Sequence, residues 1–117
     1  MQYLLLIYDA EKIWEAMPAA EAKKLREEYQ ALNRDITASG HMKAAEALES
    51  VRTATTVRVR DGKIAATDGP FAEAREQLGG FYLVEAKDVA EATQIAARIP
   101  SARHGAIEIR AIRKVVP

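Results

Sequence analysis

The sequence predicts an α+β domain in which two β-α-β units share one antiparallel sheet, with both helices on the same face of that sheet. Three observations support this fold class. Residues 3–8 and 80–86 carry apolar side chains at both parities, which is typical of strands in the middle of a sheet. Residues 25–36 and 89–99 carry apolar side chains at helical spacing. An Asp-Gly hairpin signal lies between the two units.

The first unit begins with the strand at residues 3–8. Residues 9–17 are predicted to be a loop in which Trp14 packs against the domain. Pro18 suits the first position of a helix, and Gly40 is the residue type that commonly ends one. The buried side of this helix is a stripe with spacings of four, three and four residues: Leu25, Tyr29, Leu32 and Ile36.

An inserted hairpin follows the first unit. Before it, residues 41–48 close the first unit with a weaker strand pattern, because their alanines also favour a helix. Residues 53–60 alternate and are rich in threonine and valine, which predicts a strand. Asp61 and Gly62 form a strong two-residue hairpin signal, and residues 63–66 return as the second strand of the hairpin.

The second unit starts with the strand at residues 80–86. Asp88 and Glu91 form a capping box at the start of its helix, and Pro100 stops that helix. The predicted buried side of the helix consists of Val89, Ala92, Ile95, Ala96 and Ile99. Residues 106–112 form the last strand. Its two faces carry Ile107 and Ile109 on one side and Glu108 and Arg110 on the other. This order fits a ferredoxin-like sandwich with a β-hairpin insertion, folded as a single domain over residues 1–117.

The composition excludes several classes of protein. Lys and Arg number 17, as do Asp and Glu, so the net charge is zero and a general nucleic-acid binder is disfavoured. The absence of cysteine excludes disulfides and thiolate metal sites. The longest apolar run, residues 3–8, is too short to cross a bilayer, and the N-terminus lacks a signal-peptide pattern. We therefore expect a cytoplasmic protein without membrane or direct nucleic-acid contact.

The two central strands predict a homodimer. Helices cover only one face of such a sheet, so an apolar set on the other face would meet water in a monomer. In the first strand, Leu4, Leu6 and Tyr8 point opposite to Leu5 and Ile7. In the other, Phe81 and Leu83 point opposite to Tyr82 and Val84. A second copy stacked sheet against sheet removes this exposure. The alternative is that the hairpin at residues 53–66 and the loop at residues 9–17 fold back over the patch.

Asp68 is the foremost candidate for a functional side chain. An Asp before Gly usually accepts a hydrogen bond from the N–H two residues on, but that residue is Pro70, which has none. Pro70 also favours an extended conformation at Gly69. The carboxylate then either caps a turn that begins at Pro70 or lines a cleft.

Further ionisable residues follow Asp68. If residues 70–77 form a short helix, Glu73 and Glu76 share one face, and paired carboxylates can perform acid–base chemistry or hold a hard cation. The alternative is a solvated face that also includes Arg75. Gly79 and Gly80 indicate a close backbone approach or a β-bulge.

The remaining polar candidates are scattered. His41 follows a helix-ending glycine, and His104 precedes another glycine; neither has a carboxylate or second histidine at metal-ligand spacing. Glu46, Glu108 and Arg110 could face the space between subunits, or they could be ordinary cross-strand charges. The aromatic residues Trp14, Tyr29 and Tyr82 are predicted to be core residues rather than a cofactor site.

Residues 68–76, with the sequence DGPFAEARE, resemble the DGPFAETKE signature of the YCII-related (DGPF domain) proteins, with Ala74 and Arg75 in place of Thr and Lys. Other segments also resemble that family: residues 3–8, 79–82, 99–100 and 108–110, the last followed by Ala111 instead of the usual proline. The resemblance implies a ferredoxin-like fold that dimerises as an α/β barrel. It also implies relatives that are small bacterial proteins, some of them encoded beside or fused to extracytoplasmic-function sigma factors.

The resemblance also bears on the site. The broader family has a proposed active site built on a histidine in the first helix and an aspartate after the second. This chain has Tyr29 and Ser101 at or near those positions, so that pair is not carried over and Asp68 remains foremost.

Two functions follow as hypotheses. The first is a small-molecule-binding protein or enzyme with a cleft at the dimer interface. In it Asp68 and His41 would be the catalytic residues and Glu73, Arg75 and Glu76 would bind the substrate. The second is a non-catalytic regulatory module that works with a sigma factor. The sequence identifies no cofactor and no metal.

Overall fold

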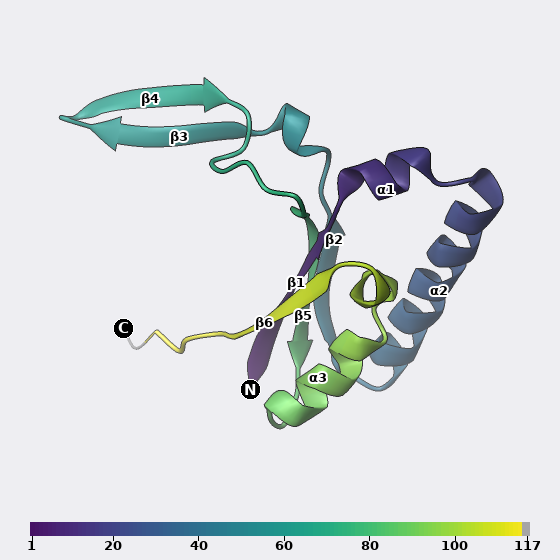
Figure 1. Ribbon diagram of the computed structural model, residues 1–117. Helices are drawn as coiled ribbons and strands as arrows, with labels where there is room; N and C mark the ends of the chain where they lie inside the picture. Colours follow the sequence, from purple (N-terminus) through teal and green to yellow (C-terminus); the bar gives the residue numbers. More distant parts are fainter. Residues whose placement is uncertain (116–117) are drawn as a thin grey trace.

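The central sheet has four antiparallel strands in the order β2-β5-β1-β6. The computed structural model describes residues 1–115 and is shown in Figure 1. The strands are β1 (Gln2–Asp9), β2 (Met42–Ala47), β5 (Gln77–Glu85) and β6 (Ala106–Ala111). The two strands with apolar residues at both parities, β1 and β5, are neighbours in the middle, as predicted. This order is that of a ferredoxin-like sheet and confirms the α+β class.

Two helices, α2 (Ala19–Ala38) and α3 (Val89–Ala97), cover one face of the sheet (Figure 1). Gly40 ends α2 with a φ of +81°, a conformation that favours glycine. Asp88 caps α3 as predicted, because its carboxylate accepts from the Glu91 N–H at 2.9 Å. No helix within residues 1–115 has both the length and the apolar character that crossing a membrane would require.

The prediction of a loop over residues 9–17 is wrong for most of that segment. Asp9 is the last residue of β1, and α1 (Glu11–Ala16) follows it as a short helix. Most side chains of this helix have fair to good helix propensity, and Glu11 places a negative charge in its first turn. The loop pattern concealed it because a six-residue helix is too short to show helical periodicity.

The core lies between the sheet and the helices. It contains the inward residues of the strands and most of the apolar stripes of both helices, including Tyr3, Leu5, Ile7, Leu32, Ile36, Tyr82, Val84, Ile95 and Ile99. The prediction that Val89 is buried is wrong, because this first residue of α3 is 57% exposed. On the opposite face, Leu4, Leu6, Tyr8, Phe81 and Leu83 are only partly buried. We call these five residues the bare face, because no helix covers them (Figure 1).

The inserted hairpin stands apart from the domain. It consists of β3 (Thr55–Arg60) and β4 (Lys63–Asp68), which pair only with each other. The turn between them has positive φ at both Asp61 and Gly62, which confirms the predicted hairpin turn. Figure 1 shows this ribbon, which we call the arm, projecting away from the sheet. The alternative in which the hairpin folds back over the bare face is therefore wrong for the protomer.

The segment between the arm and β5 is irregular. Residues 70–76 form no helix, so Glu73 and Glu76 do not share a helical face. Gly69 has a φ of +106° rather than the extended conformation predicted for it, and its N–H donates to the Ala54 carbonyl at 2.7 Å. The glycine pair behaves as predicted: the register of β1 and β5 skips Gly79, which marks a bulge. A Cβ at Gly80 would lie 2.7 Å from the Glu46 carbonyl oxygen.

Candidate functional site

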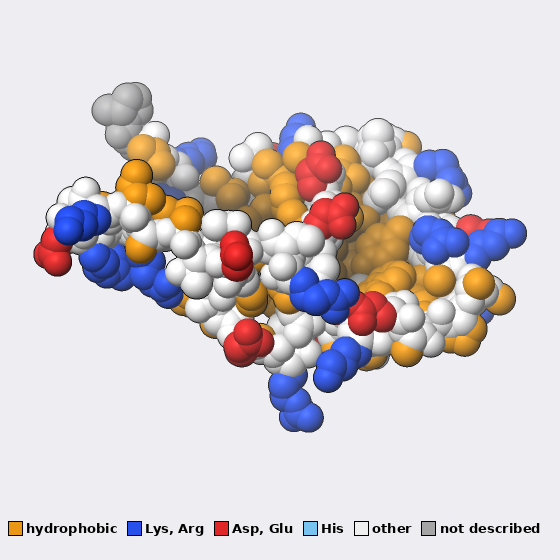
Figure 2. All heavy atoms as spheres, turned by 90° about the horizontal axis from the view of Figure 1, so that it is seen from above, with side chains coloured by type: hydrophobic (Ala, Val, Ile, Leu, Met, Phe, Trp, Pro, Cys, Tyr) orange, Lys and Arg blue, Asp and Glu red, His pale blue; other side chains and the backbone are white. Residues whose placement is uncertain are grey.

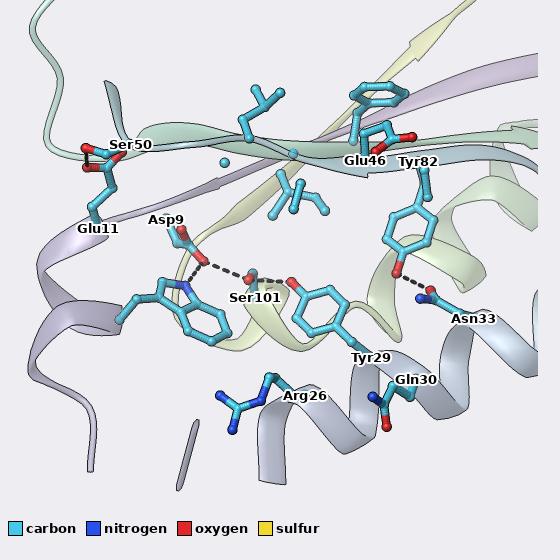
Figure 3. A pocket seen from close by; sticks show the side chains of 18 of the residues that line it. Asp9, Glu11, Arg26, Tyr29, Gln30, Asn33, Glu46, Ser50, Tyr82 and Ser101 are labelled. Carbon is cyan, nitrogen blue, oxygen red and sulfur yellow. Dashed lines mark hydrogen bonds between the residues drawn. The ribbon is translucent and has the colours of Figure 1, made fainter. Parts of the chain in front are cut away.

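A cavity of about 620 Å³ lies between α2 and the helix-covered side of the sheet (Figure 3). Ile7, Trp14 and Tyr82 contribute apolar surface to its wall. The exposed residues Arg26 and Gln30 of α2 also line it. The cavity has the size and the mainly apolar lining of a small-molecule site. We call the part around Asp9 and Ser101 its polar end; Gln30 and Asn33 add polar groups elsewhere in the lining.

The polar end is organised by the Asp9 carboxylate, which is only 5% exposed. Its Oδ2 accepts two hydrogen bonds, from the Trp14 indole Nε1–H and from the Ser101 hydroxyl, each at 2.7 Å. The Tyr29 hydroxyl lies 2.7 Å from the same Ser101 oxygen. Figure 3 shows the part of this chain of contacts that runs from Asp9 through Ser101 to Tyr29.

The protons in this chain have one consistent arrangement. A serine hydroxyl has a single proton, and Ser101 donates it to Asp9. Tyr29 must therefore donate its proton to the Ser101 oxygen. Burial raises the pKa of Tyr29 above its ordinary value, and the hydrogen bond with Ser101 only partly offsets that rise. The phenol is thus protonated at neutral pH, and its oxygen keeps lone pairs with which it can accept from a ligand.

Four separate segments of the chain position these groups. Asp9 has the same parity as Tyr3, Leu5 and Ile7, so it points to the helix-covered side at the end of β1. Trp14 comes from α1, and Tyr29 comes from the buried stripe of α2. Ser101 lies in the short 3₁₀ helix η2 (Pro100–Arg103), whose hydroxyl reaches Asp9 across 92 residues of sequence.

Gly105 brings η2 against the end of β1. A Cβ built on it would lie 2.0 Å from the Tyr8 carbonyl oxygen and 2.8 Å from the Asp9 Cβ. No side chain fits into that space, so glycine is required for this close approach of two backbones. The approach sets the distance between Ser101 and Asp9.

His104 adds a polar group next to this cluster. Its Nε2 is buried, has no hydrogen-bond partner within residues 1–115, and lies 3.9 Å from the Asp9 Oδ2. Its ring packs edge-on against Trp14, with the ring centroids 6.4 Å apart. Asp9 is not among the functional candidates predicted from the sequence, and Trp14 and Tyr29 are predicted there to be core residues. The alternation of Tyr3, Leu5 and Ile7, continued by one step, would have indicated that Asp9 is buried.

Tyr82 forms the other polar contact of the cavity, donating its hydroxyl hydrogen bond to the Asn33 side-chain oxygen. Burial raises the pKa of Tyr82 to about 12, and the nearby Tyr29 adds to the rise. The residue is therefore a hydrogen-bond donor throughout the physiological pH range.

The raised pKa of Tyr82 predicts an alkaline loss of stability. The folded chain holds the phenolic proton more tightly than the unfolded chain, whose tyrosines titrate near pH ~10. This contribution is complete below that pH and is lost as the pH rises toward the folded value of about 12. Urea midpoints measured from about pH 9 upward should fall above about pH 10. The decline should be shallower in Tyr82→Phe; equal slopes in both proteins would contradict the assignment.

The residues proposed from the sequence do not gather in one place within the protomer. Asp68 ends β4 in the arm, and Glu73, Arg75 and Glu76 follow in the irregular segment; all four are exposed. None of them lines the cavity. His41 precedes β2, where its Nδ1 lies 2.6 Å from the Ser39 hydroxyl and its Nε2 lies 3.1 Å from Glu91. Their functional roles stay predictions.

Neither alternative for Asp68 is realised within one protomer. The two hydrogen bonds next to it involve the backbone of Gly69, which donates to Ala54 and accepts from the Thr56 hydroxyl at 2.9 Å. Within residues 1–115 the Asp68 carboxylate accepts no hydrogen bond, so it is not the cap of a turn. It is exposed rather than enclosed.

The described residues contain no group of three or more His, Asp or Glu side chains arranged to hold a metal ion. Glu46, Glu108 and Arg110 lie on the exposed side of the sheet, where the register places Glu46 and Glu108 in the same row as Leu6 and Phe81. They therefore flank the bare face. Glu46 also lines the cavity, near Tyr82 and away from Asp9 (Figure 3).

Fold and site together define a small α+β sandwich with a polar cluster buried beneath its first long helix. The sequence matches the YCII-related domain over residues 1–116. The chain belongs to the YCII-related family. It is 30% identical over 119 residues to the uncharacterised protein R00369 of Rhizobium meliloti (strain 1021), a match that covers 100% of this chain and 96% of that protein. Tyr29 and Ser101, which stand at or near the positions of the family's proposed active-site pair, lie within hydrogen-bond distance of each other in this cavity.

Proposed function

We propose that this chain is a small-molecule-binding protein whose ligand occupies the cavity beneath α2. The observation that carries the proposal is the buried Asp9 carboxylate, held by Trp14 and Ser101 at the polar end of a cavity with mostly apolar walls. A buried carboxylate is costly unless its oxygens are hydrogen-bonded, and a stable core has no need of one. Such groups gather where a ligand or a reaction uses them.

The chemistry of the cluster favours a ligand that donates hydrogen bonds. Oδ2 of Asp9 is occupied by its two donors, whereas Oδ1 accepts none within residues 1–115. Oδ1 faces Gly79, 3.7 Å from the position of a Cβ built there. The lone pairs of Tyr29 are a second acceptor. A hydroxyl or amino group of the ligand would bind at this end, and Asp9 is the group that could take up a proton from it.

Trp14 makes this proposal testable, because it is the only tryptophan in the chain and it contacts Asp9. We expect its fluorescence and its indole N–H resonance to shift when phenol, benzylamine or tyramine is titrated as a probe. Asp9→Asn should weaken the binding of a responding probe by at least about tenfold, since a hydrogen bond to a charged group contributes roughly 1.5–3 kcal/mol.

The matched control is Asp35→Asn, which alters an exposed carboxylate that pairs with Arg98. It should leave the affinity unchanged. If no probe shifts the Trp14 signals, or if both variants bind the probe as well as the wild-type protein does, the cavity is not the binding site.

We further propose that the protein is a homodimer stacked through the bare face, as the sequence predicted. Leu4, Leu6 and Phe81 lie in adjacent rows of the sheet, with no helix over them. The alternative function, a non-catalytic module that works with a sigma factor, calls for an exposed recognition surface and no enclosed polar pocket. The enclosed Asp9 cluster supports the binding protein over that alternative. A cleft at the dimer interface with Asp68 and His41 as catalytic residues is a separate hypothesis from the sequence, because neither residue lines the cavity beneath α2.

A further inference from the structure

The arm has one apolar side and one basic side. The pairing of β3 with β4 sets Val57 opposite Ala66 and Val59 opposite Ile64, so these four side chains point the same way. Val57 and Val59 are 59% and 58% exposed, and Ile64 is 79% exposed. Figure 2 shows hydrophobic side chains gathered along one side of the arm and Lys and Arg side chains along the other. The basic residues are Arg58, Arg60 and Lys63.

This apolar side needs a partner. A two-stranded ribbon alone in water is marginally stable, and it becomes stable when a hydrophobic face packs against something. The arm has six paired positions on each strand, yet nearly all its side chains are exposed in the protomer. An exposed apolar strip on a projecting ribbon is typical of a protein–protein interface.

The position of the arm identifies the partner. Figure 1 shows that it projects from the end of the sheet on the side opposite α2, which is the side of the bare face. A second copy stacked on the bare face therefore lies alongside the arm. Four strands of six to nine residues present a projected area on the order of 500 Å². A standard interface buries about 800 Å² of accessible surface per partner, and the apolar strip of the arm would add to the surface that the sheet offers.

Charge is also consistent with self-association. The bare face is flanked by the exposed carboxylates Glu46 and Glu108. The three cations of the arm lie on its basic side, which faces away from the second copy when the apolar side is docked, so they do not pair with these carboxylates. A chain with zero net charge has no overall repulsion from its own copy.

We propose that the arm packs through Val57, Val59 and Ile64 against a second copy of this chain that is stacked on the bare face. This inference rests on the homodimer of the proposed function and adds the surface that completes it. The pairing register places Asp68 opposite Thr55, on the same side of the arm as Val57 and Ile64. Docking of the arm therefore carries the carboxylate of the DGPF signature into the interface, where it meets the second copy.

The absence of cysteine allows a direct test with single spin labels. A nitroxide on Ile64→Cys should be immobilised at concentrations where the protein is dimeric and mobile on dilution. The matched control is Ala65→Cys, the next residue, which points to the basic side and should stay mobile at every concentration. Equal mobility of the two labels in the dimer would overturn the proposal.

Sedimentation equilibrium separates this proposal from the sheet-stacked dimer itself. Ile64→Asp should raise the dimer dissociation constant by at least about tenfold, and Ala65→Asp should leave it nearly unchanged. Leu6→Ser probes the bare face, with circular dichroism confirming that each variant is folded. If Leu6→Ser dissociates the dimer and Ile64→Asp does not, the sheet-stacked dimer stands and the arm proposal fails. If the wild-type protein is a monomer at high concentration, both fail.

Discussion

Gly105→Ala should lower the free energy of unfolding more than the addition of a methyl group at any other glycine of this chain. The new Cβ would lie 2.0 Å from the Tyr8 carbonyl oxygen and 3.0 Å from the Asp9 Cα, so backbone atoms on one side or the other must move. Overpacking of this kind costs about 3 kcal/mol or more when the neighbour is backbone rather than a flexible side chain. Urea unfolding followed by Trp14 fluorescence would measure the loss.

Gly79→Ala is the matched control for this substitution. A Cβ at Gly79 meets only the Asp9 Oδ1, at 3.7 Å, which is ordinary contact, and the residue has no positive φ. Its free energy of unfolding should stay within about 1 kcal/mol of the wild-type value. Equal stability of the two variants would show that η2 can move away from β1 at little cost. It would contradict the statement that Gly105 fixes the distance between Ser101 and Asp9.

Asp9→Ala should destabilise the protein by about 3 kcal/mol, since two buried donors lose their common acceptor at once. Ser101 is 1% exposed and cannot exchange Asp9 for water without rearrangement. The Trp14 indole N–H loses its partner as well. Chemical denaturation of the variant at neutral pH measures this cost, and the indole N–H resonance reports whether Trp14 has been released.

Asp35→Ala provides the comparison, because that carboxylate pairs with Arg98 at the surface, where an ion pair contributes at most about 1 kcal/mol. Asp9→Asn should fall between the two, since an amide oxygen can still accept from both donors. If Asp9→Ala is as stable as Asp35→Ala, the Asp9 cluster does not stabilise this end of the sheet, and its burial serves binding alone.

The fold could be read from the sequence because its signals are local and periodic. The side-chain period of a strand shows which residues face the helices, and the stripe from Leu25 to Ile36 shows which side of α2 is buried. The hairpin turn at Asp61 and Gly62 depends on backbone conformation alone, so it too was predicted correctly. The short helix α1 was missed because six residues are less than two turns.

The candidate site could not be found in the same way. Asp9, Trp14, Tyr29 and Ser101 lie in four different elements, and only tertiary packing brings them together. The DGPF signature drew attention to Asp68, which the protomer leaves exposed on the arm. A sequence motif shows which residues are shared within a family, but it does not show whether they act in their own subunit or in a neighbouring one.

The arm begins and ends between two strands that are already bonded to each other. β2 and β5 are adjacent in the sheet. The Leu48 N–H donates to the Gly79 carbonyl at 2.9 Å, at the point where the chain leaves the sheet toward the arm and returns to it. The Glu11 carboxylate holds the base of the arm in place, because it accepts hydrogen bonds from the Ser50 hydroxyl and from the Val51 N–H. The length and the side chains of the arm can therefore change without disturbing the hydrogen bonds of the sheet or the packing of the helices on it.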